Sequence, residues 1–111
     1  MIRIDNVVRS YRTGETEVKA LRGVSLEIDS GEFLSIAGPS GSGKTTLLNL
    51  IGCIDRPDSG EIVIDGKTVS RMSDRELALF RRDRLGFVFQ TFNLIPVLSA
   101  AENVGFALSL L

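Results

Sequence analysis

The stretch GPSGSGKT occupies residues 38–45, and it indicates the fold more strongly than any other part of the sequence. It fits the pattern G-x-x-x-x-G-K-[ST], in which a glycine-rich loop joins a buried strand to a helix. We call these residues the glycine loop. Such a loop turns its backbone N–H groups inward and forms a concave, partly positive nest for phosphate oxygens. An incidental Gly/Ser-rich turn is the alternative, but average residue usage gives a chance match of roughly one in a few hundred for this chain length.

Each fixed position of the loop has a physical task. Gly38 lets the chain leave the preceding strand in a turn that a Cβ would obstruct, while Gly41 and Gly43 let the backbone approach phosphate closely. Lys44 reaches the β- and γ-phosphates as a mobile point charge. The Thr45 hydroxyl is placed to coordinate Mg²⁺, which prefers oxygen ligands. We therefore expect MgATP to bind at Gly38, Ser40, Gly41, Ser42, Gly43, Lys44, Thr45 and Thr46.

The hydrophobic patterns on both sides of the glycine loop agree with the motif. An apolar run at residues 33–37 predicts a buried parallel strand before the loop, and a Leu- and Ile-rich run at residues 46–54 predicts a helix after it. Apolar residues alternate at residues 24–28, which predicts a half-buried strand. Residues 2–8 indicate an opening strand, and residues 12–17 a polar turn.

The second half of the chain adds a hairpin, helices and another strand. Residues 61–69 predict a β-hairpin, because Asp65-Gly66 suits a type I′ turn. Ser73 with Glu76, and Ser99 with Glu102, match the helix capping box, and residues 85–89 predict a strand. This order of elements predicts an α/β fold with an antiparallel β addition.

Tyr11 and Gln90 are candidate site residues outside the glycine loop. Tyr11 lies in a polar segment, where its ring either stacks on a nucleotide base or covers the core as an aromatic lid. Gln90 follows the expected strand at residues 85–89, and ligands gather at the carboxyl ends of strands in α/β sheets. Its amide either contacts a metal ion and an attacking water or is a solvated loop side chain.

The composition excludes several classes of function. The net charge is −1, so no basic field is available to hold nucleic acid by its backbone. The chain has no histidine, and its single cysteine, Cys53, has apolar neighbours that indicate a buried structural side chain. No stretch approaches the ~20 apolar residues of a membrane span, so we expect a soluble, cytoplasmic chain.

Three segments together resemble the ATP-binding subunits of ABC transporters: residues 36–48, 55–64 and 86–96. GFVFQ at residues 86–90 and NLIP at residues 93–96 distinguish this family from other proteins with the same phosphate-loop pattern. IGCID at residues 51–55, taken with NLIP, is most similar to the lipoprotein-release and macrolide-export ATPases. The resemblance covers essentially the whole chain and aligns it with the N-terminal half of such a subunit.

The resemblance implies an α/β P-loop ATPase core with an N-terminal antiparallel β subdomain, truncated before the signature motif and the Walker B strand. Residues 1–89 would be the incomplete core, and residues 90–111 the Q-loop and the start of a helical subdomain. Tyr11 would be the A-loop aromatic that stacks on adenine, with Val18 near the base or ribose. Gln90 would be the Q-loop glutamine, which contacts Mg²⁺ and the water.

The resemblance also implies partners and an activity. A transmembrane permease subunit would lie near the segment from Thr91 to Leu98, which would place the protein on the inner face of the cell membrane. A second ATPase subunit would complete a homodimer around two ATP molecules. The function implied is a transport-coupled ATPase for export or lipoprotein release, of which this chain carries the nucleotide-loading half. Two alternatives are a non-catalytic nucleotide-binding regulatory module and, with less support, a P-loop kinase or GTPase.

Overall fold

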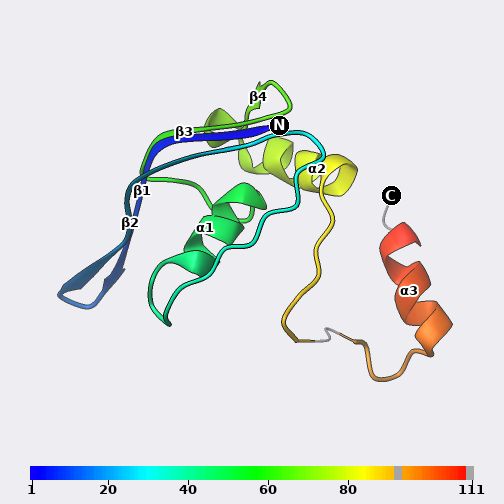
Figure 1. Cartoon of the computed structure of the whole chain (residues 1–111). Coiled ribbons are helices and arrows are strands. Elements are labelled where there is room, and N and C mark those ends of the chain that lie inside the picture. The colour runs from blue at the N-terminus through cyan, green and yellow to red at the C-terminus, as the bar shows by residue number, and fades with distance from the viewer. Residues whose placement is uncertain (92–93, 110–111) are drawn as a thin grey trace.

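A computed structural model describes residues 1–91 and 94–109 of the chain (Figure 1). The four strands form one antiparallel sheet in the order β2-β1-β3-β4. The elements in chain order are β1 (Ile2–Thr13), β2 (Thr16–Ile28), α1 (Lys44–Ile51), β3 (Ser59–Ile64), β4 (Lys67–Thr68), the 3₁₀ helix η1 (Val69–Arg71), α2 (Asp74–Arg84) and α3 (Ala100–Ser109).

β1 and β2 form a long hairpin whose tip extends beyond the rest of the sheet (Figure 1). The register of the hairpin shifts between Arg9 and Ser10, which makes Ala20 the extra residue of a β-bulge in β2. Beyond the bulge, Tyr11 lies directly opposite Val18, so that these two side chains share one face of the tip. A bulge bends the strand that carries it, so the hairpin changes direction just before Tyr11.

The core lies between the sheet and the helices α1 and α2, which stand on the same side of the sheet (Figure 1). Ile4 of β1 pairs with Ile62 of β3, and both side chains are almost completely buried. Each helix presents apolar residues three positions apart, which places them on one face. The buried apolar residues are Ile4, Val7, Leu21, Leu47, Leu50, Cys53, Ile62, Ile64, Val69, Leu77 and Phe80.

Several local expectations from the sequence are confirmed. Asp65 and Gly66 both have positive φ, 48° and 79°, as a type I′ turn requires between β3 and β4. The backbone N–H of Glu76 donates to Ser73 Oγ at 3.2 Å, so Ser73 caps α2. Cys53 is buried, as expected.

The helix that follows the glycine loop is shifted toward the loop. The expected helix spans residues 46–54, whereas α1 begins at Lys44 and ends at Ile51. It begins earlier because the loop leads directly into helical geometry after Gly43. It ends earlier because Gly52 follows it and Cys53 has a φ of 58°, a left-handed conformation that does not continue a helix.

Two expected strands, at residues 33–37 and 85–89, are not formed, and these predictions are wrong for the structure. Both segments are irregular, and the side chains of Phe33 and Val88 are fully exposed. A strand exists only with a hydrogen-bonded neighbour, and a parallel neighbour follows a long crossover connection. None of the described residues pairs with either segment in the sheet, so these apolar segments have no neighbouring strand to hydrogen-bond with.

α3 stands apart from the sheet (Figure 1). Its expected capping box is complete, because Glu102 N–H donates to Ser99 Oγ at 3.2 Å and Ser99 N–H donates to Glu102 Oε1 at 3.0 Å. The expected apolar continuation at residues 110–111 lies outside the described residues, as do residues 92–93. Within residues 1–91 and 94–109, no helix has the length and apolar character needed to cross a membrane.

Candidate functional site

The glycine loop is folded back on itself between the sheet and the start of α1. Ser42 N–H donates to the Pro39 carbonyl at 3.2 Å, which closes a turn inside the loop. Gly41 and Gly43 have φ values of 79° and 92°, a region that other residues rarely adopt. The loop therefore has the curled backbone that an amide nest requires, and it ends on the first turn of a helix, where N–H groups are unpaired.

Gly43 is also the point where the glycine loop touches the sheet. A Cβ built on Gly43 would lie 2.5 Å from the carbonyl oxygen of Ala20, the bulged residue of β2. Only a residue without a side chain fits this close approach. The bulge in the hairpin and the glycine in the loop therefore fit one another, and they fix the distance between loop and sheet.

Lys44 directs its ammonium group across the mouth of the glycine loop. Lys44 Nζ donates to the carbonyl oxygens of Gly38 and Pro39 at 2.5 and 2.6 Å, and to Ser42 Oγ at 3.2 Å. These oxygens surround the cation in the way that phosphate oxygens would. The loop thus places one mobile positive charge where an anion would enter.

A pocket of about 490 Å³ joins the glycine loop to the hairpin tip, and this volume is typical of a small-molecule site. It brings Tyr11 and Val18 together with loop residues that are far from them in sequence. Gln90 is exposed and is not among the lining residues, and Gly38 and Ser42 flank the pocket as partners of Lys44. The lining residues are Tyr11, Val18, Ala20, Ser40, Gly41, Gly43, Lys44, Thr45 and Thr46.

The ring of Tyr11 is held at the edge of this pocket rather than over the core. It is 36% exposed, its hydroxyl donates to Asp55 Oδ2 at 3.2 Å, and the guanidinium carbon of Arg9 lies 4.6 Å from its ring centroid. The alternative of an aromatic lid on the core does not describe this arrangement. What the structure presents is an aromatic ring beside a curled loop, an arrangement that can stack on a flat ligand.

Arg9, which the sequence did not indicate, contacts Tyr11 but does not line the pocket. It forms ion pairs with Asp55 and Asp58, both at 2.9 Å. Partial burial alone would lower the pKa of Arg9, but hydrogen bonds and charge attraction from these carboxylates raise it. Partial burial alone would likewise raise the pKa of Asp55, but the backbone N–H of Arg56 and the Arg9 guanidinium hold it below its ordinary value. The one available signal was that Arg9 and Tyr11, two residues apart in a strand, share a face.

The donor set near the glycine loop consists of oxygens. Thr45, whose side chain carries a hydroxyl, lines the pocket, while no group of three or more His, Cys, Asp or Glu side chains suited to a metal occurs in the described part of the chain. Mg²⁺ is commonly held by one or two protein oxygens together with substrate phosphates and water, so Thr45 fits that requirement. Gln90, the other expected metal ligand, carries an amide oxygen, but it is exposed and does not line the pocket.

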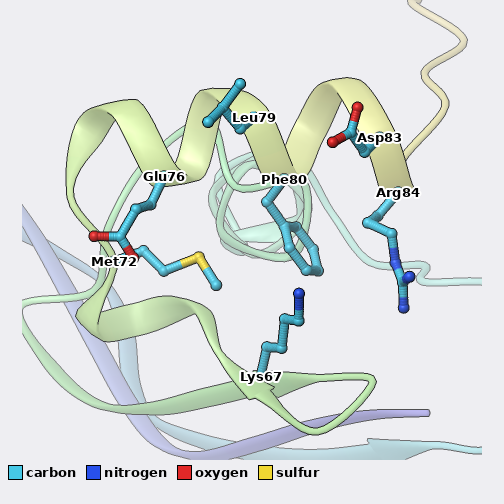
Figure 2. A pocket seen from close by; sticks show the side chains of 7 residues that line it. All are labelled: Lys67, Met72, Glu76, Leu79, Phe80, Asp83 and Arg84. Carbon is cyan, nitrogen blue, oxygen red and sulfur yellow. The ribbon is translucent and has the colours of Figure 1, made fainter.

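A second hollow, of about 340 Å³, lies between the β3–β4 turn region and α2 (Figure 2). Figure 2 shows Lys67 directed toward the ring of Phe80, with Met72 and Glu76 to one side and Asp83 and Arg84 near the other end of the helix. Its charged side chains are of both signs, and the glycine loop contributes none of its lining. It therefore lacks the features that would bind a triphosphate.

Residues 21–109 match the family described as ABC transporter. Over 104 residues the chain is 55% identical to the uncharacterized ABC transporter ATP-binding protein MJ0796 of Methanocaldococcus jannaschii, an alignment that covers 94% of this chain and 44% of that protein. It is 52% identical, again over 94% of its length, to the macrolide export ATP-binding/permease protein MacB of Hyphomonas neptunium, of which it covers 16%. The chain thus spans less than half the length of these curated relatives.

A solved structure gives the same result at the level of the fold. The dimeric, post-hydrolysis structure of the ATP-binding cassette MJ0796 bound to ADP and Pi superposes with a TM-score of 0.92 and 52% identity, over 99% of this chain and 47% of that one. The expected fold class, an ATP-binding cassette with an antiparallel β subdomain at its N-terminus, is confirmed, and this chain spans about half of such a cassette.

Proposed function

We propose, given that this chain belongs to the ABC transporter family of ATP-binding domains, that it binds MgATP between the glycine loop and the tip of the β1–β2 hairpin. The single observation that supports this most strongly is the pocket that joins Tyr11 and Val18 to Lys44 and Thr45. A ligand in that pocket meets an aromatic ring at one end and an amide nest with a cation at the other. These are the chemical requirements of a nucleoside triphosphate.

Each part of the nucleotide has a counterpart in the proposed site. The amides of the glycine loop and the start of α1 hold the phosphates, with Gly38, Ser40 and Ser42 shaping the loop. Lys44 exchanges its contacts with loop carbonyls for contacts with the β- and γ-phosphates. Bound Mg²⁺, held by Thr45, would neutralise phosphate charge. Thr46, next in α1, lies against the same pocket.

The base binds at the hairpin tip in this proposal. Tyr11 stacks on the adenine ring, and Val18, directly across the hairpin, packs against the base or the ribose. Gln90 contacts Mg²⁺ and the attacking water once the segment after residue 89 is brought toward the loop. Its position outside the pocket lining means that this last contact requires a rearrangement of residues 85–91.

For the whole protein we propose a transport-coupled ATPase that acts with a second ATPase subunit and a membrane permease. MJ0796 is described as a dimeric cassette, and MacB as a macrolide export protein with both ATP-binding and permease parts, which supports export as the process. Lipoprotein release is the other process that the sequence resemblance implies. The permease would contact the segment from Thr91 to Leu98, of which residues 92–93 lie outside the described part. The protein would then sit on the inner face of the membrane through that partner.

The test of nucleotide binding is a calorimetric titration of MgATP into the Lys44→Ala variant. We expect affinity to fall at least about tenfold, because a charge-assisted hydrogen bond contributes about 1.5–3 kcal/mol. Lys67→Ala, which removes the same charge from the second hollow, is the matched control and should leave MgATP affinity within about twofold. Equal affinities of the Lys44→Ala variant and the unsubstituted chain would reject the proposed site.

A further inference from the structure

The contacts around Tyr11 tie the hairpin to the segment that follows α1. Arg9 Nε and Nη2 donate to the two oxygens of Asp55 at 2.9 and 3.3 Å, and Arg9 Nη1 donates to Asp58 Oδ1 at 2.9 Å. A planar guanidinium can join two carboxylates in this way, whereas the single ammonium of a lysine cannot reproduce the fork. The Arg9 side chain is 23% exposed, so salt screens these ion pairs less than it screens pairs on the open surface.

This ion-pair cluster also restricts the ring of Tyr11. The Arg9 guanidinium lies over one face of the ring, and the Tyr11 hydroxyl donates to the same Asp55 carboxylate that Arg9 contacts. A cation over the face and a hydrogen bond at the hydroxyl together favour one orientation of the ring. Arg9 covers one face of the ring and does not itself line the pocket that Tyr11 lines, so a ligand that stacks on Tyr11 would use the opposite face.

The hairpin is anchored near both ends of α1. Beyond the helix, Asp58 Oδ2 accepts from Ser10 N–H at 2.6 Å, and Asp58 N–H donates to the Val8 carbonyl at 2.8 Å. At the start of the helix, Gly43 packs against the carbonyl of Ala20. Helix α1 and the turn that follows it therefore lie between the glycine loop and the two carboxylates that contact Arg9.

From these contacts we propose that Arg9 is a positioning residue, which together with Asp55 and Asp58 holds Tyr11 as a stacking platform for the nucleotide base. This inference rests on the proposed nucleotide-binding function and adds a residue to it. If Arg9 acts through Tyr11, it contributes to the binding of ATP and not to the binding of inorganic tripolyphosphate, which has no base. A role through charge alone would affect both ligands.

The experiment compares MgATP with magnesium tripolyphosphate by calorimetric titration of the Arg9→Gln variant. We expect Arg9→Gln to lower the affinity for MgATP roughly five- to tenfold more than the affinity for tripolyphosphate, because only MgATP has a base that stacks on Tyr11. Arg12→Gln, which removes the same charge from an exposed position next to Tyr11, is the matched control and should change both affinities by the same factor. Arg9→Lys keeps the charge but loses the forked guanidinium. Its MgATP affinity should lie between that of Arg9→Gln and that of the unsubstituted chain.

Tyrosine fluorescence gives a second readout that reports on this ring alone. Tyr11 is the only tyrosine in the chain, and there is no tryptophan. We expect saturating MgATP to change Tyr11 emission in the unsubstituted chain and to change it less in Arg9→Gln. The same emission change in both proteins would contradict a positioning role.

The outcomes separate this inference from the proposed function. Equal losses of MgATP and tripolyphosphate affinity in Arg9→Gln would overturn the role of Arg9, while MgATP binding by the unsubstituted chain would keep the site. Failure of the unsubstituted chain to bind MgATP would reject the site itself. If Arg9→Gln does not unfold cooperatively, Asp58→Asn replaces it, since it removes the charge of one carboxylate that pairs with Arg9. A selective loss of MgATP affinity in that variant supports the proposal, and equal losses overturn it.

Discussion

Because Gly43 has no side chain, the glycine loop can lie directly against the backbone of the sheet at Ala20. Its φ of 92° and the 2.5 Å approach of a built Cβ to the Ala20 carbonyl both exclude larger residues. Gly41, two residues earlier, also has a positive φ, 79°, but nothing lies within 4 Å of the Cβ that it lacks. Alanine would be strained by the positive φ at both positions, but it would meet a steric clash only at Gly43. Comparing the two substitutions therefore distinguishes backbone strain from steric clash.

We predict that Gly43→Ala lowers the free energy of unfolding by about 2–4 kcal/mol, the sum of strain at positive φ and overpacking against Ala20. Gly41→Ala should cost only about 1–2 kcal/mol, because strain acts there alone. Urea unfolding of both variants measures the difference. Equal losses of the free energy of unfolding in the two variants would show that the close contact between the glycine loop and the β2 bulge does not affect stability.

Sequence patterns indicated the glycine loop, Tyr11 and Val18 at the residue scale, but they did not indicate Arg9. Gly38, Lys44 and Thr45 follow from a local motif whose spacing alone encodes the chemistry. Arg9 does not, because its partner Asp55 is 46 residues away and only the folded chain brings them together. Gln90 was a candidate by its place after an apolar run, and the structure leaves it exposed outside the pocket.

At the scale of elements, Asp55 is the titratable group that links β1 to the segment after α1, through its ion pair with Arg9. The pKa of Asp55 is held below its ordinary value in the folded chain, so its carboxylate stabilises the fold at pH above the unfolded value of about 4. As pH falls through the lowered folded pKa, Asp55 takes up a proton and this stabilisation is lost.

We therefore predict that the free energy of unfolding falls less between about pH 6 and pH 3 in Asp55→Asn than in the unsubstituted chain. Urea unfolding at the two pH values measures this. Asp83→Asn is the control, because the pKa of Asp83 is also lowered by its neighbour Arg82, but the pair is more exposed and better screened. The same pH dependence in Asp55→Asn and the unsubstituted chain would show that the Arg9–Asp55 contact does not stabilise the fold.

Elements that depend on neighbouring residues could be predicted from the sequence, whereas elements that depend on distant partners could not. The type I′ turn at Asp65-Gly66 and the caps at Ser73 and Ser99 depend on a few neighbouring residues, and they appear where the sequence places them. The strands expected at residues 33–37 and 85–89 depend on partners elsewhere in the sheet. Apolar patterning shows that such a segment can be buried but not that a neighbouring strand is present.

At the scale of the whole molecule, the described sheet and helices resemble about half of a solved cassette. The match covers 99% of this chain and 47% of the cassette. Among the described residues the antiparallel sheet β2-β1-β3-β4 forms, while the segments at residues 33–37 and 85–89, both expected as strands, have no partner in it. The division into residues 1–89 and residues 90–111 stays a prediction. So does the permease contact near residues 91–98.

The central claim is that one pocket holds both ends of a nucleotide, and amide shift mapping tests it most directly. MgATP added to the ¹⁵N-labelled chain should shift the amide signals of the glycine loop and of Tyr11 and Val18 together. Magnesium tripolyphosphate should shift the signals of the loop and leave the hairpin tip largely unchanged. The claim would be contradicted if MgATP shifted neither region, or if its effects were confined to residues around the second hollow at Lys67 and Phe80.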